Sequence, residues 1–307
     1  MASASELTLA SIAGSWSPQP VAVLLAGGAL WWYLSRRARL DRIGQPWSAL
    51  RTSSFVAGLG LLVIICCGPA AHFGRSVYWV WLSQSLTLLL IVPVPLMAGQ
   101  PIELARLSNP AGRTSGWLDA ATGRWFSSPL VGPALMPLVC VAALFGPVPG
   151  WAAGSAPVSW LVQLLLLGIG SVIVLPLVVA GDTLSSVAVG AAVAVGFIEL
   201  LVDAVPGIVL RLSTHPASGF FSHRHSVAGA PAWLHDQQIG GGILWCVAEL
   251  LDLPFLLLVF RRWVRADARE AAAVDAVLDE RELRRPTDQD DDTPWFLTDP
   301  RMRDRFR

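Results

Sequence analysis

The chain has 307 residues, of which 54% are hydrophobic and 14% are charged. Soluble domains carry about 25% charged residues, so this composition argues against a soluble globular protein and indicates a chain embedded in a lipid bilayer. The formal net charge is zero, which leaves no basic footprint of the kind that nucleic-acid binding requires. No nucleic-acid partner is therefore expected.

Seven apolar runs follow one another along the chain, and each is close to the roughly 20 residues that a helix needs to cross a bilayer. The expected spans are 18–35, 53–71, 77–98, 129–148, 156–180, 184–210 and 238–260. The weakest division is the short connection 181–183, so six spans is the alternative count. The predicted fold class is all-α, a polytopic membrane bundle of about seven transmembrane helices.

Arginine placement predicts the orientation, because cytoplasmic loops collect positive charge. All 22 basic residues are Arg, and 19 of them fall in the first loop, the third loop and the segment that follows the last span from Arg261 onward. This pattern predicts residues 1–17 outside, a transmembrane domain over 18–262, and a cytoplasmic tail over 263–307 that is first helical and then disordered and acidic. The Arg-only basic set also suggests a bacterial source, and hence the bacterial plasma membrane.

Two pairs of carboxylates lie inside predicted spans, where an ionisable group is costly and often marks function. Glu199 and Asp203 are four residues apart in the sixth span, and Glu249 and Asp252 are three apart in the seventh. Each pair shares one helix face, so the two helices together form a candidate acidic cluster. The cluster either ties helices together structurally or handles a metal ion or protons.

Four of the five histidines lie in or next to the loop before the last span, namely His215, His223, His225 and His235. Imidazole suits copper and zinc, so the pair His223 and His225 is a candidate metal site. The alternative is that these histidines are ordinary solvated loop residues. The four cysteines, Cys66, Cys67, Cys140 and Cys246, fall in apolar runs without ligand spacing and are expected to be small buried side chains.

Three consecutive glycines, Gly240 to Gly242, open the last span, and Trp245 and Glu249 follow them. Glycine is a poor helix former, so the run indicates either close approach between helices or a strained entry turn. A dinucleotide-binding loop is excluded, because no strand and crossover pattern surrounds the glycines.

The segment 236–275 resembles the closing segment of the CtaG-type cytochrome c oxidase assembly factors. The resemblance rests on an Asp-Gln pair, two glycines, a Trp and a Glu that open the last helix, and a looser likeness begins near residue 73. The matching positions here are Asp236, Gln237, Gly240, Gly241, Trp245 and Glu249. The resemblance implies a plasma-membrane helper in the maturation of haem-copper oxidase, acting on an oxidase subunit and with copper as its possible metal.

The third span departs from the family pattern HMxQHM, since the corresponding residues here read WLSQSL. Trp81 and Ser85 stand where the family has histidines, Gln84 persists, and Asp203 takes a further histidine position. The sequence therefore predicts a protein that is not an enzyme. Either Glu199, Asp203, Glu249 and the outer histidines replace the lost copper ligands, or the protein holds an oxidase subunit as a scaffold. The alternative function is a transporter for protons or a small ion through the intramembrane carboxylates.

Overall fold

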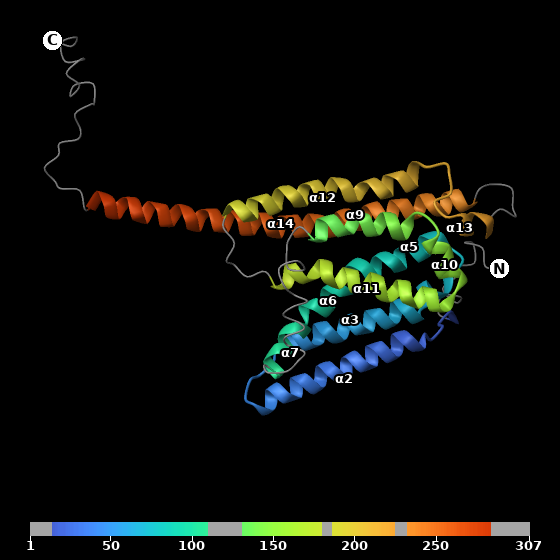
Figure 1. Ribbon diagram of the computed structural model, residues 1–307, viewed down its shortest axis with the longest axis horizontal. Coiled ribbons are helices and arrows are strands. Elements are labelled where there is room, and N and C mark those ends of the chain that lie inside the picture. Colours follow the sequence, from blue (N-terminus) through green and yellow to red (C-terminus); the bar gives the residue numbers. More distant parts are fainter. Residues whose placement is uncertain (1–13, 110–130, 180–185, 225–231, 284–307) are drawn as a thin grey trace, which may run out of the picture.

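A computed structural model describes residues 14–109, 131–179, 186–224 and 232–283, and the regular structure within these ranges is helical (Figure 1). The helices with more than ten residues are α2 (Pro20–Arg42), α3 (Ala49–Cys67), α9 (Val131–Leu144), α11 (Ala156–Val179), α12 (Ser186–Leu212) and α14 (Ala232–Leu283). The shorter ones are α4 (Pro69–Phe73), α5 (Tyr78–Leu86), η2 (Thr87–Ile91), α6 (Pro93–Ala98), α7 (Pro101–Ser108), α10 (Val148–Gly154) and α13 (Gly219–Arg224). The predicted all-α class is therefore confirmed for the described part of the chain.

The long helices run up and down through one elongated bundle (Figure 1). Short helices α4, α10 and α13 lie at one end, which we call the N-terminal end. The α2–α3 connection, α7 and the C-terminal extension of α14 lie at the other, which we call the arginine end because Arg36, Arg51 and Arg106 belong to it. Successive long segments thus cross the bundle in alternating directions, as a polytopic membrane protein requires.

Three stretches of the described residues are long and apolar enough to cross a membrane: Ala49–Phe73, Tyr78–Ser108 and Ala156–Leu175. They correspond to the second, third and fifth of the predicted spans. The chain is thus a multi-pass membrane protein on the strength of these helices, while the count of seven and the orientation remain predictions.

Prolines define where several helices begin, because their fixed φ suits the first helical turn and their missing N–H is not needed there. Pro20, Pro69, Pro93 and Pro101 stand at the first position of α2, α4, α6 and α7. Gln100, directly before Pro101, has a φ of 50°. This left-handed residue turns the chain from α6 into the amphipathic α7.

The third span contains a π-helical turn between α5 and α6. The Val92 N–H donates to the Thr87 carbonyl at 2.8 Å, five residues back, and Pro93 follows without an N–H of its own. Gly170 of α11 packs against the Leu89 carbonyl so closely that a Cβ would collide with it. The widened turn therefore provides the close contact between this span and α11.

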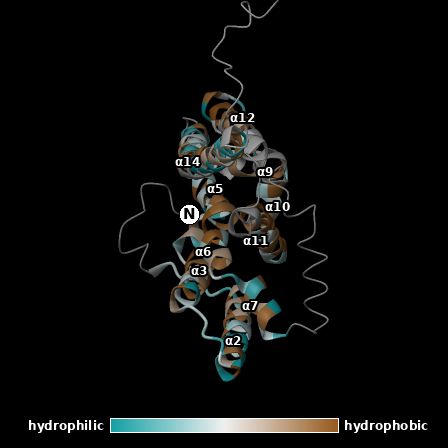
Figure 2. Ribbon diagram, turned by 90° about the vertical axis from the view of Figure 1, so that its left-hand side faces the viewer, coloured by the Kyte–Doolittle hydropathy of each residue, from teal (hydrophilic) through white to brown (hydrophobic). Residues whose placement is uncertain are grey.

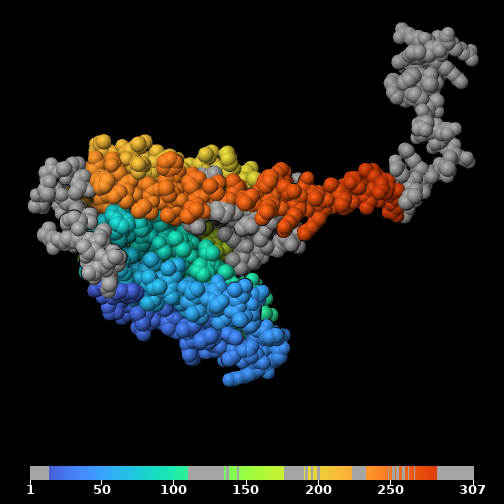
Figure 3. Space-filling model, turned by 180° about the vertical axis from the view of Figure 1, so that it is seen from behind, coloured from blue at the N-terminus to red at the C-terminus, as the bar shows by residue number. Residues whose placement is uncertain are grey.

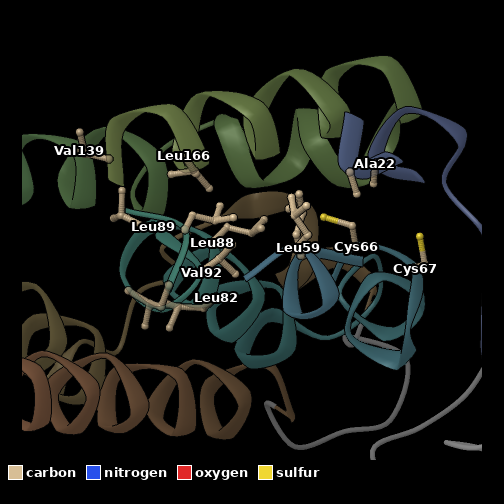
Figure 4. Packing of buried hydrophobic residues seen from close by; sticks show 14 of the residues in the cluster. Ala22, Leu59, Cys66, Cys67, Leu82, Leu88, Leu89, Val92, Val139 and Leu166 are labelled. Carbon is tan, nitrogen blue, oxygen red and sulfur yellow. The ribbon is translucent and has the colours of Figure 1, made fainter. Parts of the chain in front are cut away.

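A single large cluster of buried apolar residues joins α2, α3, the third span, α9 and α11, with Leu82, Leu88 and Val92 near its centre (Figure 4). Seen from the arginine end, α12 and α14 lie together on one side and α2 on the other, and hydrophobic residues colour much of the helix surface (Figure 2). Exposed Leu24, Leu201 and Leu250 are among the apolar side chains on those flanks, which fits contact with lipid.

The limits of two helices differ from those of the predicted spans. The last predicted span, 238–260, lies within α14, a single helix of 52 residues that continues into the tail predicted to be helical, and its end projects beyond the other described helices (Figure 3). The fourth span was predicted over 129–148, whereas α9, described from Val131, ends at Leu144 before the chain turns into α10.

Candidate functional site

Asp236 in the first turns of α14 caps the N-terminus of α5. Its carboxylate accepts hydrogen bonds from the backbone N–H groups of Tyr78 at 2.8 Å and Trp79 at 3.0 Å. The first N–H groups of a helix have no partner inside the helix, and Val77, at the N-cap position of α5, makes no side-chain cap. A residue about 158 positions away in sequence thus supplies the cap, and it is only 8% exposed.

Gln237 binds the connection between α12 and α13. Its amide nitrogen donates to the carbonyls of Leu210 at 3.3 Å and His215 at 3.2 Å, and its amide oxygen accepts from the Ala217 N–H at 2.8 Å. The side chain is 4% exposed. The Asp-Gln pair therefore fastens the start of α14 to two different elements at the N-terminal end of the bundle.

Gly241 lets α14 approach α12. A Cβ at Gly241 would lie 2.7 Å from the Gly207 carbonyl oxygen and 2.7 Å from the Arg211 backbone nitrogen. A Cβ at Gly207 would in turn lie 2.9 Å from the Gly241 carbonyl oxygen. Because the obstructing atoms are backbone, neither glycine can be replaced without separating the helices. The glycine run is therefore a helix contact, and the alternative of a strained entry turn is wrong, since α14 runs through it without a break.

Gly240 and Tyr78 complete the junction between α14 and α5. A Cβ at Gly240 would meet the Trp79 Cα and the Tyr78 ring at 3.5 Å. The Tyr78 ring packs against Trp81 at 6.2 Å between centroids and edge-on against Phe221 of α13 at 5.4 Å. We call the residues Tyr78, Gly207, Asp236, Gln237 and Gly241, with their contacts, the α14 junction.

The carboxylate positions predicted in the sixth and seventh spans lie at the same height along the paired helices α12 and α14. Gly207 packs against Gly241, and Gly196 packs against Leu256. In an antiparallel pair these two contacts place positions 199–203 opposite position 249. Asp203 is buried, at 5% exposure, whereas the side chains of Glu199 and Asp252 lie outside what the structure describes.

Glu249 is half-buried and accepts a hydrogen bond of 3.3 Å from the Trp245 indole nitrogen, one turn back on the same helix. Trp245 itself is 41% exposed. These two resemblance residues are therefore more exposed than the buried Asp236 and Gln237, although the Trp245 Cβ packs against Gly207 of α12. Cys246 beside them is exposed as well, so the expectation that all four cysteines are buried is wrong at this position.

Gln84 and its neighbours in α5 are part of the packed interior. The Gln84 amide nitrogen donates to the Ile65 carbonyl of α3 at 3.0 Å. Trp81 is buried, and the Ser85 hydroxyl donates to the Trp81 carbonyl at 2.9 Å. Gln84 thus ties two helices together, while the two positions at which the resemblance implies histidines carry an indole and a serine bonded to its own helix.

The outer histidines are only partly described. His215 and His235 are exposed, the His223 side chain is not described, and His225 lies outside the described residues. Within the described ranges, no three side chains of His, Cys, Asp or Glu come close enough together to hold a metal ion. The predicted metal residues Glu199, Asp203, Glu249, His223 and His225 therefore remain a prediction.

Another buried polar contact lies at the arginine end of the bundle, and the sequence did not predict it. The buried Tyr33 hydroxyl donates to the Gly99 carbonyl at 2.7 Å and accepts from the Trp47 indole nitrogen at 2.9 Å. The Tyr33 ring stacks on Phe55 with centroids 4.1 Å apart. The chain has only two tyrosines. Tyr33 lies inside an apolar run, and this position could have predicted a buried hydroxyl with a hydrogen-bond partner.

The family model of the cytochrome c oxidase caa3 assembly factors (Caa3_CtaG) matches residues 11–266 of this chain. Among curated proteins, an uncharacterised protein of Mycobacterium bovis and one of Mycobacterium tuberculosis are each 22% identical over 259 residues. An uncharacterised protein of Mycobacterium leprae is 23% identical over 257 residues. Each alignment covers 79% of this chain and 38% of the relative, so the chain spans about two-fifths of the length of these relatives.

No solved structure matches the chain. The family model covers most of the chain, from before α2 into the C-terminal part of α14, and so includes both the α14 junction and the third span. The chain belongs to the Caa3_CtaG family of cytochrome c oxidase assembly factors.

Proposed function

We propose that this protein helps a haem-copper cytochrome c oxidase to mature in the bacterial plasma membrane, and that it does so by holding an oxidase subunit. The family match over residues 11–266 carries this proposal. The four buried or close-packed resemblance residues Asp236, Gln237, Gly240 and Gly241 all make contacts between helices. What the chain shares with the family at these positions is therefore architecture.

We propose seven spans with the N-terminus outside and the tail in the cytoplasm. The arrangement of the helices supports this topology, because the arginine-bearing C-terminal part of α2, the start of α3, α7 and the charged extension of α14 lie at the same end of the bundle (Figure 1). Positive charge gathered at one end is the usual mark of the cytoplasmic side.

Copper handling through the third span does not fit the residues present. An indole at position 81 is no copper ligand, and the Ser85 hydroxyl is already used within its helix. Copper would therefore have to bind at the acidic residues of α12 and α14 or at the outer histidines. These alternatives give the copper version of the proposal a definite test.

The copper test compares the purified wild type with two variants, one lacking the carboxylates (Glu199, Asp203 and Glu249 to Ala) and one lacking His223 and His225. Stoichiometric Cu(I) binding that is lost in one variant would locate a copper site and replace the scaffold proposal. Binding no higher than background in the wild type is the result that the scaffold proposal expects.

The scaffold itself is tested by deleting the gene in its host and measuring assembled oxidase by its haem spectrum and oxygen consumption. Loss of assembled oxidase, restored by the wild-type chain and also by the carboxylate variant, is the expected result. Crosslinking from the exposed flank of α14 should capture an oxidase subunit. Normal oxidase levels in the deletion strain would overturn the proposed function.

A proton or small-ion transporter is the second candidate, because positions 199–203 and 249 lie at one level of the α12 and α14 pair. It predicts ion flux in proteoliposomes that the carboxylate variant abolishes. The scaffold proposal predicts no flux above that of empty liposomes.

A further inference from the structure

A small cavity lies between the N-terminal part of α2, the C-terminal part of α3 and the N-terminal part of α11. Its volume is about 20 Å³, and its polar lining comes from Gln19, Cys66, Trp160 and Gln163. Ala22 forms part of the apolar wall, and Figure 4 shows Ala22 and Cys66 at the same end of the core. No residue of this cavity belongs to the α14 junction or to the carboxylate level of α12 and α14.

Two of the lining side chains present buried polar atoms that have no hydrogen-bond partner within the described part of the chain: the Gln19 amide oxygen and the Trp160 indole nitrogen. Gln19 is 7% exposed. It occupies the N-cap position of α2, yet its side chain makes no capping hydrogen bond. One atom is an acceptor and the other a donor, so a single molecule that both donates and accepts matches the pair.

Two backbone contacts hold Gln19 in this position. The Gln19 N–H donates to the Cys67 sulfur at 3.4 Å, and the Ser17 N–H donates to the Cys67 carbonyl at 2.9 Å. The segment before α2 is thereby fixed on the end of α3, and its side chain at position 19 cannot move far from the cavity.

We propose that this cavity binds one water molecule, which donates to the Gln19 amide oxygen and accepts from the Trp160 indole N–H. The volume exceeds the roughly 10–15 Å³ that one water needs, and a buried water requires two to four polar partners. The Cys66 thiol, a weak donor and acceptor, lines the same space as a third. A metal cation does not fit, because the indole N–H is a donor only, and a small apolar ligand would leave both polar atoms unpaired.

The bridge would connect the segment before α2, which is already fixed on α3, to α11. It would therefore hold three separate parts of the chain at the N-terminal end of the bundle. A dry cavity of the same size would add nothing to this connection.

A substitution that fills the cavity distinguishes a bound water from a dry cavity, because the change in stability has opposite signs in the two cases. Ala22→Val adds two methyl groups to the wall, which stabilises a protein with a dry cavity but expels a bound water and leaves two polar atoms unpaired. We expect the substitution to lower the melting temperature of the full chain in detergent by about 4–8 °C. The double variant Gln19→Leu and Trp160→Phe lacks both the amide oxygen and the indole nitrogen that would be left without partners. In this background Ala22→Val should be neutral or stabilising.

Ala26→Val is the matched control, because Ala26 is equally buried on the next turn of α2 and does not line the cavity. Its effect should be the same in both backgrounds. An Ala22→Val shift that is equal in both backgrounds, or that stabilises the wild type, would overturn the proposal.

Ultraviolet resonance Raman difference spectra between the wild type and Trp160→Phe give a direct readout, since they isolate the Trp160 indole. A hydrogen-bonded N–H in the wild type that becomes non-bonded in Gln19→Leu supports the bridge. A non-bonded N–H in the wild type, or a bonded N–H that Gln19→Leu leaves unchanged, contradicts it. Gln19→Met, which keeps an unbranched chain, replaces Gln19→Leu if that variant does not fold.

Discussion

Removal of the Asp236 carboxylate should destabilise the whole N-terminal end of the bundle. The side chain accepts two hydrogen bonds, from the buried Tyr78 N–H and the partly buried Trp79 N–H. A hydrogen bond to a charged group contributes about 1.5–3 kcal/mol, and a buried donor left without a partner costs about as much. Because Trp79 N–H is closer to solvent, we expect a loss of about 3 kcal/mol for Asp236→Ala.

For a protein of this size, about 3 kcal/mol corresponds to a decrease of roughly 5 °C in melting temperature. Asp236→Asn keeps one acceptor oxygen and should lose about half as much. A thiol-reactive fluorescent dye provides the assay in detergent, because Cys66, Cys67 and Cys140 are buried and become reactive on unfolding. The exposed Cys246 gives a constant background.

Asp41→Ala is the control for loss of a carboxylate that is not part of the junction. Asp41 makes only an exposed ion pair of 3.9 Å with Arg37, and such pairs contribute about 0–1 kcal/mol. Equal decreases for Asp236→Ala and Asp41→Ala would refute the capping argument.

Three further substitutions test other contacts, and a fourth, Gly60→Ala, is the control for the first of them. Gly241→Val should separate α14 from α12 and prevent accumulation of folded protein, whereas Gly60→Ala, where nothing lies within 4 Å of a new Cβ, should gain up to about 1 kcal/mol of helix propensity. Gln237→Leu, which strands the Ala217 N–H, should cost about 1–3 kcal/mol and raise protease cleavage between α12 and α13. Tyr33→Phe removes the hydroxyl between Gly99 and Trp47 and should cost a similar amount, and an unchanged melting temperature would contradict the structure there.

The contacts of the α14 junction could be predicted from the sequence only in part. The glycine run predicted close approach between helices, and Gly241 makes that approach. The partner, Gly207, was not identifiable, because the contact joins residues 34 positions apart in two different helices. Asp236 was recognised only as part of a family pattern, since nothing in the local sequence indicates that a carboxylate caps a helix more than 150 residues upstream.

The internal geometry of the third span was not predicted from the sequence. Its apolar length predicted one continuous span over 77–98. The structure divides the span into α5, a π-helical turn and α6. A proline without an N–H made a local change of pairing predictable, but the choice of a π-helical turn depends on Gly170 and the packing of α11, which lie far away in sequence.

The two parts of the family pattern therefore have different physical meanings in this chain. Asp236, Gln237 and Gly241 form the α14 junction through contacts that any member with the same packing would need. Trp81 and Ser85, which stand where the resemblance implies histidines, are buried in this chain. The contacts of the junction are present, whereas these two residues of the third span depart from the resemblance, and this difference is why we propose that the chain holds a partner.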